Sequence, residues 1–171
     1  MVVTMSFTPA RLRPGEIIAA AGAVALAACM FLLPWFGLTG RIERLLAGLG
    51  TATTVDGWNA LTINRWLMLA TILVTLALFV VQASSRAPAL PVSLSVIATV
   101  LGIVTSLVLI DRVLIDTPFS SPLIDTKVGA YLGLVSSLVL SYGAVRSLRE
   151  EDRPDPTRNA AIPTVKLPSE R

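Results

Sequence analysis

The chain has 171 residues, of which 54% are hydrophobic and 15% are charged, so it is more apolar and less charged than an ordinary soluble domain. This composition excludes a disordered chain, which needs low hydrophobicity, and the single cysteine excludes a scaffold held by disulfide bonds. With 14 basic residues, 11 acidic residues and no histidine, the chain lacks both the basic excess of a nucleic-acid-binding surface and the commonest general acid–base and metal ligand.

Four segments without a charged residue are long enough to cross a bilayer, namely 17–36, 66–83, 92–110 and 128–145. About 20 helical residues span a hydrocarbon core of about 30 Å. The alternative is a soluble protein with four buried helices, but a helix of a soluble domain normally keeps one polar face. We therefore expect an all-α, integral membrane fold, a four-helix transmembrane bundle over 17–149.

Polar segments flank and connect these spans. They comprise an N-terminal segment (1–16), two outer loops (37–65 and 111–127) and a proline-containing tail (150–171) that we expect to be disordered. Seven basic residues lie near the span ends on the side of the termini and five on the other side. The positive-inside rule therefore places both termini in the cytoplasm.

The first outer loop contains a short amphipathic pattern. Ile42, Leu45, Leu46 and Leu49 recur at i, i+3, i+4 and i+7, while the intervening positions include charged residues. This spacing predicts a helix, which the following glycines end. Two placements remain open: the helix lies in the outer membrane interface with its apolar face toward lipid, or it packs on top of the bundle.

Tryptophans and charges gather on the same outer side. The three indoles lie near the outer ends of the first two spans and predict half of an aromatic belt at the headgroup level: Trp35, Trp58 and Trp66. The rim charges are Arg65, Asp111, Arg112, Asp125 and Lys127. Because no cation-binding loop pattern occurs, we expect these carboxylates to pair with the basic residues or to face water.

Small residues recur at every fourth position in three spans and predict faces on which helices approach closely. They are Gly129, Gly133, Ser137 and Ser141 in the fourth span, Ala98, Gly102 and Ser106 in the third, and Ala19, Ala23 and Ala27 in the first. In lipid such close packing assembles a bundle, because no hydrophobic force drives helices together. Internal packing is the default interpretation, and pairing with another subunit is the alternative.

The spans carry hydroxyl groups but no ionisable side chain, whereas transporters, pumps and channels usually place ionisable groups within the membrane. Hydroxyls such as those of Thr71, Thr75 and Ser95 can bond to carbonyls of their own helix. The sequence has no histidine-based triad, no zinc motif, no cysteine pair and no glycine-rich phosphate loop. We therefore expect no enzymatic activity, no cofactor and no bound metal.

The single cysteine follows a pattern that also occurs in lipoproteins. Leu26–Cys29 matches a lipoprotein cleavage box, at which processing would make Cys29 a lipid-modified N-terminus. Residues 30–36 remain apolar, although a lipoprotein would normally turn polar there. We therefore expect an uncleaved first span.

Four short stretches fall in a familiar order along the chain. They are Trp58–Leu61, Arg86–Pro91, Gly129–Leu134 and Ser147–Glu150. With this order, most of residues 17–151 resembles a group of small four-span membrane proteins of high-GC Gram-positive bacteria. The resemblance implies four spans and a bacterial plasma membrane, and it brings no established activity and no functional residue.

These observations favour a non-enzymatic, multi-pass protein of the plasma membrane. Its expected partners are the lipid bilayer and either a second copy of the chain or another membrane protein, so that it would serve as a structural or accessory subunit of a cell-envelope complex. The alternative is a protein that handles small solutes or lipids in a cavity between the helices. A cavity beside Thr71, Thr75 or Ser95 would favour that alternative, and a tightly packed interior would count against it.

Overall fold

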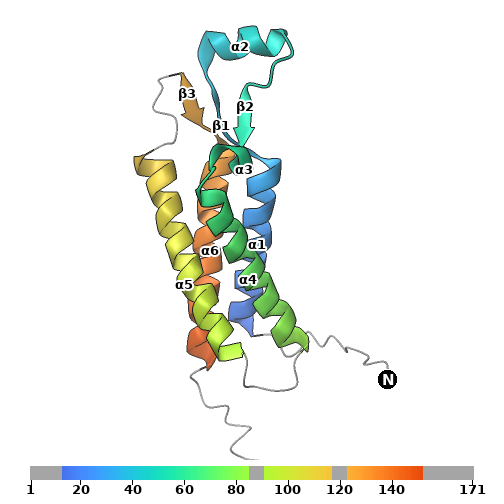
Figure 1. Cartoon of the computed structure of the whole chain (residues 1–171), viewed down its shortest axis with the longest axis vertical. Coiled ribbons are helices and arrows are strands. Elements are labelled where there is room, and N and C mark those ends of the chain that lie inside the picture. Colours follow the sequence, from blue (N-terminus) through green and yellow to red (C-terminus); the bar gives the residue numbers. More distant parts are fainter. Residues whose placement is uncertain (1–12, 85–90, 117–122, 152–171) are drawn as a thin grey trace, which may run out of the picture.

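The computed structural model describes residues 13–84, 91–116 and 123–151, in which four long helices form a bundle (Figure 1). The four helices are α1 (Pro14–Leu32), α4 (Asn64–Ser84), α5 (Pro91–Ile110) and α6 (Val128–Glu151). Each is long and apolar enough to cross a membrane, and α5 continues as a π-helix, η2 (Asp111–Ile115). The prediction of four long apolar helices is therefore confirmed.

The bounds of the first span differ from the prediction. Residues 66–83, 92–110 and 128–145 are helical as expected, but α1 ends at Leu32, four residues before the predicted end. Pro34 lacks a backbone N–H and disfavours helical geometry in the residue before it, so the helix stops there. The predicted N-terminal segment and tail lie mostly outside the described residues.

A small antiparallel sheet lies at one end of the bundle, so the all-α prediction was wrong in this respect. Its strands are β1 (Pro34–Leu38), β2 (Thr54–Asp56) and β3 (Ile124–Thr126), in the order β2-β1-β3. Phe36 pairs with Val55 on one side and with Thr126 on the other. The central strand thus pairs with a strand from each of the two predicted outer loops, a contact that the sequence analysis did not predict.

The amphipathic helix of the first loop is present as α2 (Gly40–Gly48). Gly40 and Gly50 flank its body with φ angles of +73° and +74°, a conformation that favours glycine. Figure 1 shows α2 on the far side of the strands from the bundle, and Leu45 and Leu49 are 67% and 79% exposed. The interpretation that α2 packs on top of the bundle was therefore wrong.

Helices α1 and α6 approach so closely that no side chain fits between them at several glycines. A Cβ atom added to Gly15 would lie 2.5 Å from the backbone nitrogen of Ser147, and one added to Gly22 would lie 2.6 Å from that of Leu140. Gly143 faces Ala19 in the same way. Of the predicted α1 stripe, Ala19 lies at this interface, Ala23 is fully buried in the core, and Ala27 is only partly buried.

The predicted stripes of α5 and α6 also lie inside the bundle. Ala98 is fully buried, and a Cβ atom on Gly102 would lie 3.1 Å from the hydroxyl of Ser141. Ser106 Oγ lies 2.8 Å from Ser141 Oγ and donates to Ser137 Oγ over 3.3 Å. Gly129 and Gly133 face the first residues of the sheet, as described below.

Hydroxyl groups between α4 and α5 bond both within and between the helices. Thr71 Oγ1 donates to the carbonyl of Leu67 over 2.9 Å and lies 2.6 Å from Thr105 Oγ1. Thr99 likewise donates to the carbonyl of Ser95 over 2.8 Å. Bonding to the helix's own carbonyls, expected from the sequence, is thus confirmed for Thr71 and Thr99. It is wrong for Thr75, whose buried Oγ1 has no hydrogen-bond partner within the described residues.

Candidate functional site

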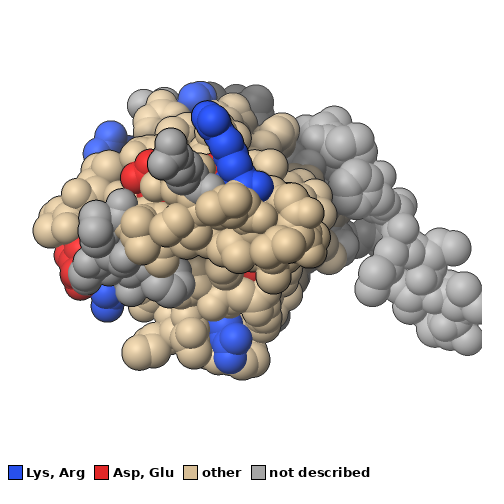
Figure 2. Space-filling model, turned by 90° about the horizontal axis from the view of Figure 1, so that it is seen from above, with Lys and Arg blue, Asp and Glu red and all other residues tan. Residues whose placement is uncertain are grey.

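The five short elements at one end of the bundle form a single unit, which we call the head (residues 34–60 and 123–127). It contains β1, α2, β2, the short helix α3 (Gly57–Ala60) and β3. The helices α1 and α6 have their other ends, near the chain termini, at the opposite end of the bundle (Figure 1). Seen from above, the molecule shows mostly uncharged side chains, and the basic ones are scattered rather than gathered in one patch (Figure 2).

Trp35 fastens the head to the bundle. Its side chain is 0% exposed, and its indole Nε1 donates to the carbonyl of Cys29 over 2.8 Å. The ring fills the space above two glycines: a Cβ atom on Gly57 would lie 2.6 Å from it, and one on Gly133 would lie 2.7 Å from its Cη2. Trp35 therefore does not belong to an aromatic belt, because its ring contacts protein rather than headgroups.

Backbone bonds and one lysine hold the head together. Lys127 N donates to the carbonyl of Trp35 over 2.7 Å, next to the β1–β3 ladder. The Lys127 ammonium donates to the carbonyl of Leu38 and lies 3.6 Å from the Glu43 carboxylate of α2. Lys127 thus ties the strands to α2, whereas the sequence predicted an aspartate as its partner.

The other rim charges do not form one cluster. Arg112 pairs with Asp116 over 3.0 Å on the outside of η2, and the side chains of Asp111 and Asp125 are exposed. Arg65 has no carboxylate partner in the part of the chain that the structure describes. The expectation that rim carboxylates pair with basic residues or face water is met at Arg112, Asp111 and Asp125.

Arg65 instead lies against the rings of two tryptophans, in a group that we call the Trp–Arg cluster (Phe31, Trp58, Arg65 and Trp66). Its guanidinium carbon is 5.1 Å from the ring centroid of Trp58 and 5.5 Å from that of Trp66. The rings of Trp58 and Phe31 are 5.4 Å apart, and those of Trp58 and Trp66 are 5.6 Å apart. Three helices, α1, α3 and α4, therefore meet at this cluster.

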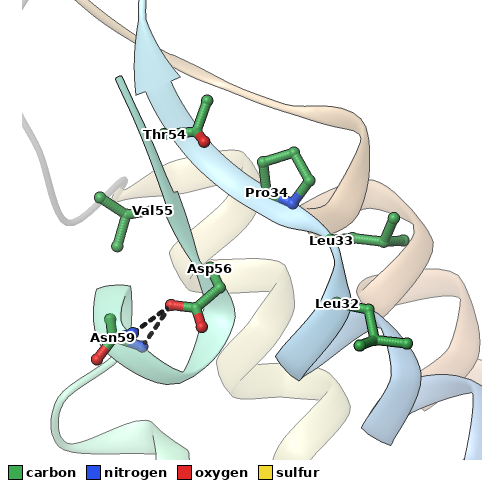
Figure 3. Close-up of a pocket in the computed structure, with 7 residues that line it drawn as sticks. All are labelled: Leu32, Leu33, Pro34, Thr54, Val55, Asp56 and Asn59. Carbon is green, nitrogen blue, oxygen red and sulfur yellow. Dashed lines mark hydrogen bonds between the residues drawn. The ribbon is translucent and has the colours of Figure 1, made fainter. Parts of the chain in front are cut away.

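An open pocket of about 460 Å³ lies nearby, where α1 passes into β1 (Figure 3). Its lining residues are Leu32, Leu33, Pro34, Thr54, Val55, Asp56 and Asn59. Asp56 caps α3, because its Oδ1 accepts hydrogen bonds from the backbone and side-chain nitrogens of Asn59 over 3.2 and 2.6 Å. The pocket therefore has an apolar side formed by α1 and a polar side whose carboxylate already serves as a helix cap.

One buried carboxylate at the opposite end of the bundle was missed by the sequence analysis. Glu16 is 6% exposed in the first turn of α1, and its carboxylate accepts a hydrogen bond from the backbone nitrogen of Arg13 over 3.3 Å. With the amide of Gln82 turned so that its nitrogen faces the carboxylate, Gln82 donates to Glu16 Oε2 over 2.7 Å. The signal in the sequence was a lone glutamate directly before a span and a lone glutamine near the end of another.

Within the described residues, no three histidine, cysteine, aspartate or glutamate side chains come together as a metal site would require. Comparisons of the chain with protein-family models, curated proteins and solved structures found no match.

Proposed function

We propose that this chain is a multi-pass protein of a bacterial plasma membrane, without enzymatic activity, that serves as an accessory subunit of a cell-envelope complex. In this proposal the four helices anchor the chain, the head lies on the outer side, and α2 binds a protein partner. The observation that carries the proposal is the exposure of Leu45 (67%) in α2 and of Leu49 (79%) directly after it, in a segment that lies beyond the strands from the bundle (Figure 1). Burial of a leucine contributes about 1.5–3 kcal/mol, so these side chains favour a partner.

The position of α2 supports a protein rather than the bilayer as that partner. The five residues of β1 run away from the end of α1 and reach about 16 Å in extended form. The headgroup layer adds only about 5–8 Å to each side of the hydrocarbon core. An interfacial helix must bury its apolar face near the boundary between headgroups and acyl chains, and the position of α2 beyond the strands (Figure 1) supports a protein partner instead.

The rigidity of the head also supports a binding role. The buried indole of Trp35 and the three-stranded sheet hold the strands on both sides of α2 to the bundle, and Lys127 contacts Glu43 of α2. A surface fixed in advance loses less conformational freedom on binding and so binds more tightly for the same contacts.

The burial of the interior hydroxyls favours this proposal over solute or lipid handling between the helices. Thr71, Thr75 and Ser95 are 0%, 2% and 1% exposed, and Thr71 lies against Thr105 of the neighbouring helix. These are the positions at which a cavity would have supported the alternative.

The test is a pull-down of the full chain from mild detergent, repeated with the double variant Leu45→Ser/Leu49→Ser. We expect the wild type to retain a partner protein in fixed stoichiometry, and the double variant to retain it at least about tenfold more weakly, because two apolar contacts are lost. The matched control is Leu114→Ser/Ile115→Ser, which changes two exposed apolar residues of η2, outside the head. A solitary wild-type monomer, or equal retention by the α2 variant, would contradict the proposal.

A further inference from the structure

Arg65 stands out among the basic residues near the head because its guanidinium contacts two aromatic rings and no carboxylate of the described residues. Arg112 and Lys127 each have an acidic partner. Within the described residues, the guanidinium of Arg65 makes no ion pair, and its Nε is buried without a hydrogen-bond partner. The faces of Trp58 and Trp66 attract the positive charge, but they accept none of its hydrogen bonds in the plane of the guanidinium.

The terminal N–H groups of Arg65, rather than its buried Nε, are the donors that suit a phosphate. A guanidinium presents its N–H groups as a planar fork that matches the oxygens of a phosphate, and such charge-assisted bonds are stronger than neutral ones. The rings of Trp58 and Trp66 lie on the same side of the guanidinium and restrict the directions in which it can turn. The cluster contributes one positive charge and no carboxylate, which favours a ligand with net negative charge.

The depth of Arg65 in the bundle points to a lipid as the source of that phosphate. Arg65 is the second residue of α4, whose 21 residues match the thickness of the hydrocarbon core at about 1.5 Å each. Its guanidinium therefore lies at the level of the lipid headgroups. The apolar side chains beside it are exposed, with Phe31 at 47%, Trp66 at 58% and Ile63 at 84%, so acyl chains can lie against them.

We propose that the Trp–Arg cluster binds the headgroup phosphate of an anionic phospholipid, with the guanidinium of Arg65 as the phosphate-binding group. Trp58 and Trp66 orient the guanidinium, and Phe31 and Trp66 contact the acyl chains. This inference does not depend on the proposed partner of α2, because the cluster lies on the bundle side of the head and uses different residues.

The experiment measures lipid binding to the full chain in detergent micelles by native mass spectrometry. The probes are phosphatidylglycerol, phosphatidylcholine and the water-soluble glycerophosphoglycerol headgroup. The variants are Arg65→Gln and Arg65→Lys, and the matched control is Arg112→Gln, a second arginine at the same end of the bundle that is paired with Asp116.

We expect the wild type to bind phosphatidylglycerol more tightly than phosphatidylcholine and to bind the soluble headgroup far more weakly than either. Arg65→Gln should weaken phosphatidylglycerol binding about tenfold, equivalent to about 1.4 kcal/mol, and Arg112→Gln should leave it unchanged. Arg65→Lys should weaken it about threefold, because a lysine keeps the charge but loses the planar fork. If circular dichroism shows that Arg65→Gln has lost its helices, the comparison is made with Arg65→Lys alone.

Three results would overturn the inference. The first is equal binding of phosphatidylglycerol by the wild type and by both Arg65 variants. The second is equal binding of phosphatidylglycerol and phosphatidylcholine by the wild type. The third is binding of glycerophosphoglycerol as tight as that of the intact lipid, which would indicate a site for a soluble phosphate instead.

Discussion

The indole of Trp35 occupies space that Gly57 and Gly133 leave open, and its N–H bonds to the carbonyl of Cys29. Because the ring is fully buried, a larger side chain beside it must displace the ring. Single methyl groups at these glycines should therefore have large effects, while glycines with open surroundings should tolerate substitution.

We predict that Gly133→Ala lowers the free energy of unfolding by about 1–3 kcal/mol, the usual cost of overpacking a core. The control is Gly48→Ala at the end of α2, where a Cβ atom would meet nothing within 4 Å. That variant should be neutral or slightly stabilising, because alanine favours helix over glycine. Thermal unfolding of both variants in detergent checks the difference, and equal stability of the two would contradict the role of Trp35.

Two features at the residue scale could not be predicted from the sequence: the inward direction of Trp35 and the glycines at the contact between α1 and α6. A tryptophan at the end of a span normally indicates the membrane interface, and only the fold shows that Trp35 turns inward. The glycines between α1 and α6 were missed because Gly15 and Gly22 are seven residues apart rather than four. By contrast, the sequence shows directly that Gly129, Gly133, Ser137 and Ser141 recur at every fourth position.

At the scale of elements, hydroxyl pairs join neighbouring helices. We predict that a double-mutant cycle with Thr71→Val and Thr105→Val gives a coupling energy of about 0.6 kcal/mol, typical of hydrogen bonds between membrane helices. Thr71→Val with Thr99→Val is the control, because Thr99 donates to the carbonyl of Ser95 in its own helix. Unfolding in mixed micelles with a denaturing detergent measures both cycles, and a control coupling as large as that of the pair would refute a direct bond.

The long helices could be predicted because a charge-free run of suitable length is a strong signal. The sheet could not, since β2 and β3 have three residues each, too few for a period of two to be recognised. The pairing of Phe36 with Thr126 also joins residues 90 positions apart, which no local pattern indicates. The helix α2 could be predicted from its pattern of leucines. Its distance from the bundle could not, because that distance depends on the sheet.

At the scale of the whole molecule, the bundle of four helices has two distinct ends. The head lies at one end, and the start of α1 and the end of α6 lie at the other (Figure 1). If the helices cross a membrane, residues of α2 and residues at the end of α6 must face opposite compartments. The excess of basic residues on the terminal side predicts that this side faces the cytoplasm.

The most direct test of this account is labelling of introduced cysteines with a membrane-impermeant maleimide in intact cells. Arg44→Cys in α2 and Arg149→Cys near the end of α6, both exposed positions, are compared in a Cys29→Ala background. The account predicts that Arg44→Cys is labelled in intact cells, whereas Arg149→Cys is labelled only after the membrane is permeabilised. Labelling of both cysteines in intact cells would contradict it.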